Sequence, residues 1–242
     1  MPENVRTSGP AAADLVAGLA GDGFARLSGQ DFAVDTGGAA FRDFRAGWED
    51  LVLDGALVDG GSYRYRRYGR LAAVPSGAGF ELTPLPHRTF RQDGIPMWRS
   101  NDRLFAPIEP AFLDDRCLRE IITTDLSLAA QVRSSPEWTV GLHMIRIVAV
   151  AGEPGLPTPE GRHRDGHSFV GMHLVRRENS AGGESAIYRD GLPDVQFTLR
   201  DPLESVLVDD TAIWHEASPI SILDPAGGRT VRDMLLVDVN PA

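Results

Sequence analysis

Apolar residues have helical spacing in the first half of the chain. They recur every three or four positions in three stretches, 10–20, 39–52 and 111–133, and these stretches predict helices. Residues 23–27 predict a short strand. Residues 62–70 alternate tyrosine and arginine in part, which predicts a strand with basic residues on one face.

From residue 138 onward the pattern becomes that of strands. Residues 138–150 are nearly all apolar or β-branched, as in a strand that is covered on both faces. Further strands with turn residues between them are predicted at 169–175, 185–188, 196–199, 205–208 and 231–239. Helices followed by many short strands predict a mainly β fold with flanking helices, in which a jelly-roll, cupin-like barrel is buttressed by N-terminal helices.

The length of 242 residues suits one domain with a sizeable core. We expect residues 1–242 to form this domain in three parts. These parts are a mobile tail over 1–9, helical support and lid loops over 10–137, and the core barrel over 138–242. The long loop over 85–110 is rich in turn residues, and we expect it to arch over the mouth of a pocket.

Charge and composition narrow the class of partner. The chain has 24 basic and 34 acidic residues, a net charge of -10, which argues against a nucleic-acid partner. No run approaches the ~20 apolar residues of a membrane span, so no membrane partner is expected. With the single Cys117 and no secretory signal, a reducing cytoplasm is predicted. The expected partners are a small-molecule substrate and, at most, a second copy of the chain in a homodimer.

Three residues form the candidate metal site. His163 and Asp165 are two positions apart, so their side chains leave an extended backbone on the same face, and His215 follows a turn much later in the chain. Two imidazoles and one carboxylate fill one face of an octahedron and leave three positions open, which is typical of non-haem Fe(II) oxygenases. A zinc hydrolase accepts the same ligand types, and a surface loop with incidental histidines is the simplest alternative.

The other polar residues near this site are given different roles. His167 is expected to lie just outside the metal's ligands, because Gly166 turns the backbone, and His173 is expected to be a packed histidine. His143 can face either the pocket or the core. His87 and Gln92, in the long loop, are interpreted as surface or turn residues.

A dicarboxylate cosubstrate such as 2-oxoglutarate needs a cation at the pocket floor, and the planar fork of arginine suits a carboxylate. Arg232 and Arg229 are the candidates. We favour Arg232, because it belongs to a predicted strand whereas Arg229 follows a Gly-Gly turn. The arginines within 62–70 have two interpretations: charges that protect an edge strand, or an anchor for a substrate carboxylate.

These residues together resemble a known family. The matching stretches are PEGRHRDGHSFV (159–170), GGE (182–184), Asp209 and Asp210 before WHEASPI (214–220), and Arg232 with Asp233. The chain is similar there to the bacterial 2-oxoglutarate/Fe(II)-dependent dioxygenases typified by L-isoleucine hydroxylase. The resemblance is clearest over 138–240 and looser over 63–68 and 85–108.

The resemblance implies a double-stranded β-helix that uses Fe(II), 2-oxoglutarate and O2 to hydroxylate a free amino acid. His163, Asp165 and His215 match the iron ligands, and Arg232 matches the 2-oxoglutarate anchor. Asp165 argues against a halogenase, in which a small residue replaces the carboxylate. Desaturation, epoxidation or sulfoxidation by the same centre, a cupin-like hydrolase or isomerase, and a non-enzymatic binding protein remain as alternatives.

Overall fold

The computed structural model describes the whole chain except residues 1–11, 56, 58 and 93–101. The tail expected over 1–9 lies outside the described residues. Among the described residues, no helix is long and apolar enough to cross a membrane.

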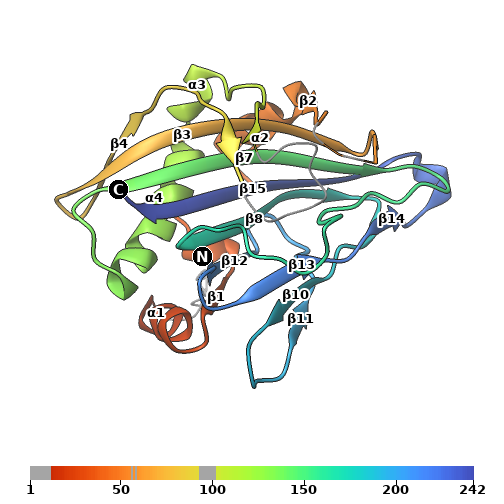
Figure 1. Ribbon diagram of the computed structural model, residues 1–242. Helices are drawn as coiled ribbons and strands as arrows, with labels where there is room; N and C mark the ends of the chain where they lie inside the picture. The colour runs from red at the N-terminus through yellow and green to blue at the C-terminus, as the bar shows by residue number, and fades with distance from the viewer. Residues whose placement is uncertain (1–11, 56, 58, 93–101) are drawn as a thin grey trace, which may run out of the picture.

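A large, mainly antiparallel sheet forms the back wall of the molecule (Figure 1). Its strands, in spatial order, are β1 (Phe24–Leu27), β12 (Ser205–Asp209), β8 (Phe169–Glu178), β15 (Thr230–Pro241), β7 (Trp138–Ala149), β3 (Arg64–Ser76) and β2 (Val52–Leu53), with β4 (Gly79–Pro84) also paired to β3. The long strands β7 and β15 lie at its centre, and their apolar runs are buried on both faces. The sequence predicts this double cover for β7 and a strand for β15.

Shorter strands form a second layer in front of this wall. They are β10 (Ser185–Tyr188), β11 (Val195–Phe197) and β13 (Trp214–Ala217) in one sheet, β9 (Ser180–Gly182) with β14 (Ile220–Ile222) in another, and β5 (Phe90–Arg91) with β6 (Asp102–Arg103) in a third. The two layers make a jelly roll whose sheets are not hydrogen-bonded into a closed barrel. The mainly β fold class is therefore confirmed.

Helices cover the outer face of the large sheet. They are α1 (Ala12–Gly21), α2 (Ala39–Ala46), α3 (Pro110–Leu113) and α4 (Arg116–Val132), with 3-10 turns η1 (Gly29–Asp31) and η2 (Gly47–Asp50). A third 3-10 turn, η3 (Pro225–Gly227), lies in the connection between β14 and β15. Figure 1 shows α4 crossing behind the central strands. Its apolar face joins Trp138 and Val237 in the main core, so the N-terminal helices buttress the sheet as predicted.

Two elements differ from the sequence-based expectation. The helix expected over 39–52 ends at Ala46, because η2 turns the chain so that Trp48 can donate hydrogen bonds to the carbonyls of Ile145 and Met234. The strand predicted at 62–70 is not an edge strand: β3 pairs with β7 on one side and with β2 and β4 on the other. The interpretation that the arginines of β3 protect an edge strand is therefore wrong.

Candidate metal centre

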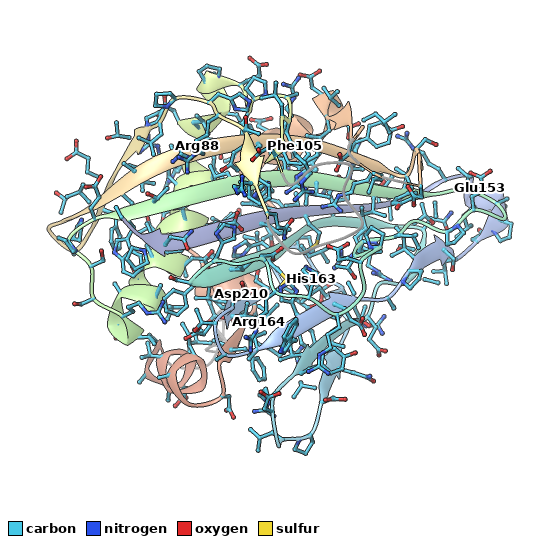
Figure 2. The ribbon with its side chains drawn as sticks, viewed as in Figure 1. Arg88, Phe105, Glu153, His163, Arg164 and Asp210 are labelled. Atoms are coloured by element: carbon cyan, nitrogen blue, oxygen red, sulfur yellow. The ribbon has the colours of Figure 1, made fainter. Side chains whose placement is uncertain are left out.

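The loop before β8 and the strand β13 bring two histidines together between the two layers. His163 and His215 form an antiparallel bridge, in which each backbone N–H donates to the other residue's carbonyl at 3.0 Å. Their ring centroids are 4.5 Å apart. Figure 2 shows His163 close to Arg164 and Asp210, between the large sheet and the short strands of the front layer.

Asp165 completes a cluster of three potential ligands. Single donor atoms of His163, Asp165 and His215 all lie within 4.8 Å of one another. The Nε2 atoms of His163 and His215 lie 3.5 and 3.3 Å from the two Asp165 carboxylate oxygens. Both histidines are buried, and Asp165 Oδ2 and His215 Nε2 have no hydrogen-bond partner among the described residues. These unsatisfied atoms face one point, so the residues fit a divalent metal ion.

Hydrogen bonding fixes the tautomer of His163. Its Nδ1 lies 2.8 Å from the carbonyl oxygen of Gly161, and a carbonyl can only accept, so Nδ1 carries the proton. Nε2 points toward Asp165 and is the nitrogen that can bind a metal once it carries no proton. An imidazole oriented by a backbone carbonyl is the usual arrangement for a metal-binding histidine.

The electrostatics of the cluster favour a cation among these side chains. Burial alone would raise the pKa of Asp165, but the nearby imidazoles of His163 and His215 hold it well below its ordinary value. Burial would lower the pKa of His215, but Asp165 and Asp210 raise it to about 10. The carboxylates thus stabilise positive charge at this point, and a bound metal would displace the imidazole protons.

Asp210 holds the loop that carries Asp165. It is 1% exposed, and it accepts the backbone N–H groups of Asp165, Gly166 and His167 at 3.1, 2.7 and 3.0 Å. Gly166 has a φ of +87°, a conformation that favours glycine. In the sequence, Asp210 was recognised only as part of a family motif. The signal for its role was an acidic residue directly before a turn, which is too common to identify a loop anchor.

Gln92 and Arg103 extend the hydrogen-bond network, and here one expectation was wrong. Gln92 is only 5% exposed, and its Nε2 donates to Asp165 Oδ1 at 3.0 Å, whereas we expected a surface or turn residue. Arg103 in turn donates to Gln92 Oε1. These contacts join β5 and β6 to the cluster, a connection that spacing along the sequence does not indicate. His87 is exposed, as expected.

The remaining histidines lie outside the cluster of three. His167 contacts Asp238 at 3.1 Å and the Asn240 amide at 3.0 Å. His173 is fully buried between Asp125 and Ser205, which confirms a packed, hydrogen-bonded role. His143 is also buried, and its Nε2 lies 2.8 Å from Asp238.

Arg232 and Arg229 have very different surroundings. Arg232 is 4% exposed and lines the same cavity as the three clustered residues, and its Nε has no hydrogen-bond partner among the described residues. Burial, and then the nearby Arg177, lower its pKa to about 10, so it is still protonated at neutral pH. Arg229 is exposed just after η3 and lies outside that cavity. Arg232 forms no salt bridge with a carboxylate among the described residues.

Comparisons with known proteins agree with this site. A family model described as 2OG-Fe dioxygenase matches residues 45–238. The L-isoleucine-4-hydroxylase of Bacillus thuringiensis is 29% identical over 140 residues, which are 56% of this chain and 57% of that protein. The 3(1)-hydroxy-L-isoleucine 4-dioxygenase of Pantoea ananatis is 24% identical over 201 residues, which are 81% of this chain and 78% of that protein.

Solved structures extend the similarity to the whole fold. A bsmA homolog from Methylobium petroleophilum PM1 superposes with a TM-score of 0.85 at 28% identity, over 98% of this chain and 95% of its own. The IDO protein from Bacillus thuringiensis superposes with a TM-score of 0.77 at 20% identity, over 99% of both chains, and this match concerns the fold alone.

Proposed function

The chain belongs to the 2OG-Fe dioxygenase family, whose members use Fe(II) and 2-oxoglutarate, and from this we propose that it hydroxylates an unactivated C–H bond of a free L-amino acid. His163, Asp165 and His215 hold the metal, and Arg232 binds the distal carboxylate of 2-oxoglutarate. The observation that carries the proposal is a cluster of three donor atoms in the same cavity as a buried arginine that has no counter-ion among the described residues.

Bound Fe(II), with 2-oxoglutarate and O2, supplies the oxidising power that an unactivated C–H bond requires, while 2-oxoglutarate leaves as succinate and CO2. The chain supplies position. Gly161 orients His163, Gln92 holds one oxygen of Asp165, and Asp210 holds the backbone of the same loop. The substrate carbon must be held in place as well, because misplacement by about 1 Å can cost a hundredfold in rate.

The cavity that contains these groups is polar at some points and apolar at others. Ile145, Ile147, Met234 and Leu236 supply an apolar wall from β7 and β15. Such a wall keeps water away from the reacting carbon and suits an aliphatic side chain. The names of the two relatives, which concern isoleucine and hydroxy-isoleucine, support an aliphatic amino acid as substrate.

The test is a screen of the twenty amino acids, free and N-acylated, with Fe(II), ascorbate and 2-oxoglutarate. We expect succinate to rise above the substrate-free background for at least one free aliphatic amino acid, with a product 16 mass units heavier, as one added oxygen requires. Equal succinate with and without every compound would overturn the substrate class. A product that has lost two hydrogens would replace hydroxylation by desaturation.

A further inference from the structure

A second group of cations lines the cavity on the other side of β7 from Arg232. In the register of the large sheet, Ile147 pairs with Arg232 of β15 on one side and with Arg64 of β3 on the other. Two positions earlier in β7, and therefore on the same face, Ile145 pairs with Met234 of β15 and with Arg66 of β3. The two isoleucines therefore separate two cationic places on one wall. Since one cation serves 2-oxoglutarate in the proposed function, the other is available to a second anionic molecule.

Arg66 is held rigidly at this second place. It is 4% exposed, and its guanidinium donates to Nδ1 of His143 at 2.6 Å. Because arginine can only donate, His143 Nδ1 accepts, and its Nε2–H donates to Asp238 at 2.8 Å. The guanidinium also lies 4.2 Å from the ring centroid of Phe105. The side chain is thus oriented before any ligand arrives, which lowers the entropy cost of binding.

Arg66 forms no ion pair with a carboxylate in the part of the chain that the structure describes, although Asp54 and Asp238 act on it from a greater distance. Its Nε has no hydrogen-bond partner among the described residues. Its neighbour Arg64, by contrast, lies 3.6 Å from Asp54. Burial, and then Arg64 and Arg103, lower the pKa of Arg66 well below its ordinary value. A carboxylate ligand would relieve this repulsion and supply the missing acceptor.

Glu160 provides an opposite charge in the same cavity. Its side chain is 7% exposed, and its Oε2 has no hydrogen-bond partner among the described residues. Its ion-pair partner in the described part of the chain is Nε2 of His163, at 3.6 Å. When that nitrogen binds a metal it carries no proton, so Glu160 loses this partner. A buried carboxylate in that position favours a ligand with an ammonium group.

We infer that Arg66 and Glu160 form the recognition site for the two charged groups of a free α-amino acid, Arg66 for the carboxylate and Glu160 for the ammonium. The inference rests on the proposed function and specifies its substrate: a zwitterion, neither amidated nor N-acylated, with its side chain against Ile145 and Ile147. His143 and Asp238 act as positioning residues for Arg66.

Anaerobic calorimetry tests this assignment without turnover. The protein is loaded with Fe(II) and 2-oxoglutarate and titrated with whichever of L-isoleucine, L-leucine and L-methionine yields most succinate in the screen. It is then titrated with the amide of that amino acid, which lacks the carboxylate, and with the matching 2-hydroxy acid, which lacks the ammonium. We expect the wild-type protein to bind both analogues at least tenfold more weakly, because each leaves a buried charge unpaired.

The variants assign each charge to its residue. Arg66→Met should weaken amino-acid binding about 10- to 100-fold and leave amide binding nearly unchanged, so that discrimination against the amide is lost while discrimination against the hydroxy acid remains. Glu160→Gln should show the reverse pattern. Arg67→Met, from the neighbouring position where the side chain contacts Asp50 and Pro107, is the matched control and should keep both preferences.

The outcomes separate this inference from the proposed function. Equal weakening of all three ligands in Arg66→Met, or a loss confined to 2-oxoglutarate binding, would overturn the role of Arg66. If Arg66→Met does not fold, Arg66→Lys decides, because it keeps the charge and loses the fork: weaker binding of the amino acid with unchanged binding of the amide is expected. A wild-type protein that makes succinate only with N-acylated compounds would retain the dioxygenase and refute the zwitterion site. Absence of succinate with every compound would instead refute the proposed function, and this inference with it.

Discussion

Two consecutive residues of β15 show that buried charges on the two faces of the large sheet differ in their ion pairing. Asp233, on the helix side, is fully paired: it accepts from Arg146 at 2.7 and 3.0 Å and from Arg176 at 2.8 Å. Arg232, on the cavity side, is equally buried and has no ion-pair partner among the described residues. Burying an unpaired charge is costly, so a charge left without a partner is reserved for a ligand, whereas a paired charge holds the sheet together.

The largest expected effect comes from removing the carboxylate of the three proposed metal ligands. Asp165→Ala should abolish metal binding and substrate-dependent succinate formation, by more than the 10- to 100-fold cost of losing a residue that only orients a ligand. Metal titration by calorimetry measures the first and a succinate assay the second. Asp194→Ala, in the exposed turn before β11, is the control. Retention of substrate-dependent succinate in Asp165→Ala would refute the assigned ligands.

On the helix side of the sheet, the expected effect of removing Asp233 is on stability. Asp233→Ala leaves Arg146 and Arg176 without their buried partner and should lower the free energy of unfolding by about 3 kcal/mol. Chemical denaturation measures this value. The KM for 2-oxoglutarate should stay within about twofold, because Asp233 faces away from the cavity. A large rise in that KM with unchanged stability would contradict the division between the faces.

On the cavity side of the sheet, the expected effect of removing Arg232 is on binding. Arg232→Met should raise the KM for 2-oxoglutarate by about 10- to 100-fold, because a charged hydrogen bond is worth about 1.5–3 kcal/mol. It should leave the unfolding free energy unchanged or slightly higher, since a buried charge without a partner is removed. Steady-state kinetics and denaturation measure the two quantities. If Arg229→Met raised the KM and Arg232→Met did not, the choice of anchor would be wrong.

A smaller effect is expected from removing the contact between Gln92 and the proposed metal ligand Asp165. Gln92→Leu removes the hydrogen bond to Asp165 Oδ1 and should weaken metal binding about tenfold. His87→Leu, a change at an exposed position of the same loop, should have no effect on the metal affinity. Equal affinities of the wild-type protein and Gln92→Leu would show that Asp165 is oriented by its backbone contacts with Asp210 alone.

The smallest effect concerns the pH dependence of stability, through Glu49 at the exposed edge of the ion-pair network around Asp233. Hydrogen bonding to Arg146 outweighs partial burial, and with Arg176 it lowers the pKa of Glu49 from 4.5 to about 2. A depressed pKa stabilises the folded state above pH 4.5, and this contribution is lost as the pH falls toward 2. Because Glu49 is 54% exposed, we expect well under 1 kcal/mol. Denaturation at pH 5.5 and 3.5 should show a slightly smaller loss in Glu49→Gln than in the wild-type protein, and an identical loss would contradict the prediction.

The sequence predicted those parts of the molecule that depend on local patterns. The apolar runs of β7 and β15 indicated central strands, and the spacing of His163 and Asp165 indicated a shared face. The distal His215 required the additional assumption that a jelly roll brings distant strands together. Arg232 was preferred to Arg229 because a strand position is better fixed than a turn, and its role as the 2-oxoglutarate anchor stays a prediction.

The rest depends on contacts between segments far apart in the chain. Gln92 lies in a loop that looks exposed, and its burial results from packing against Asp165, 73 residues later. Arg66 has the same local pattern as an edge-strand charge, and only its pairing with β7 places it in the cavity. The helix over 39–52 ended early because Trp48 bonds to carbonyls of β7 and β15, which no local periodicity encodes.

The most direct test of the central claim is the mass of the amino-acid product formed under 18O2. A dioxygenase with this metal centre should insert one atom from O2, so the product should be heavier by 18 mass units under 18O2 and by 16 under ordinary O2, with succinate formed in equal amount. An unlabelled product, or an amino acid recovered unchanged while 2-oxoglutarate is consumed, would contradict the account.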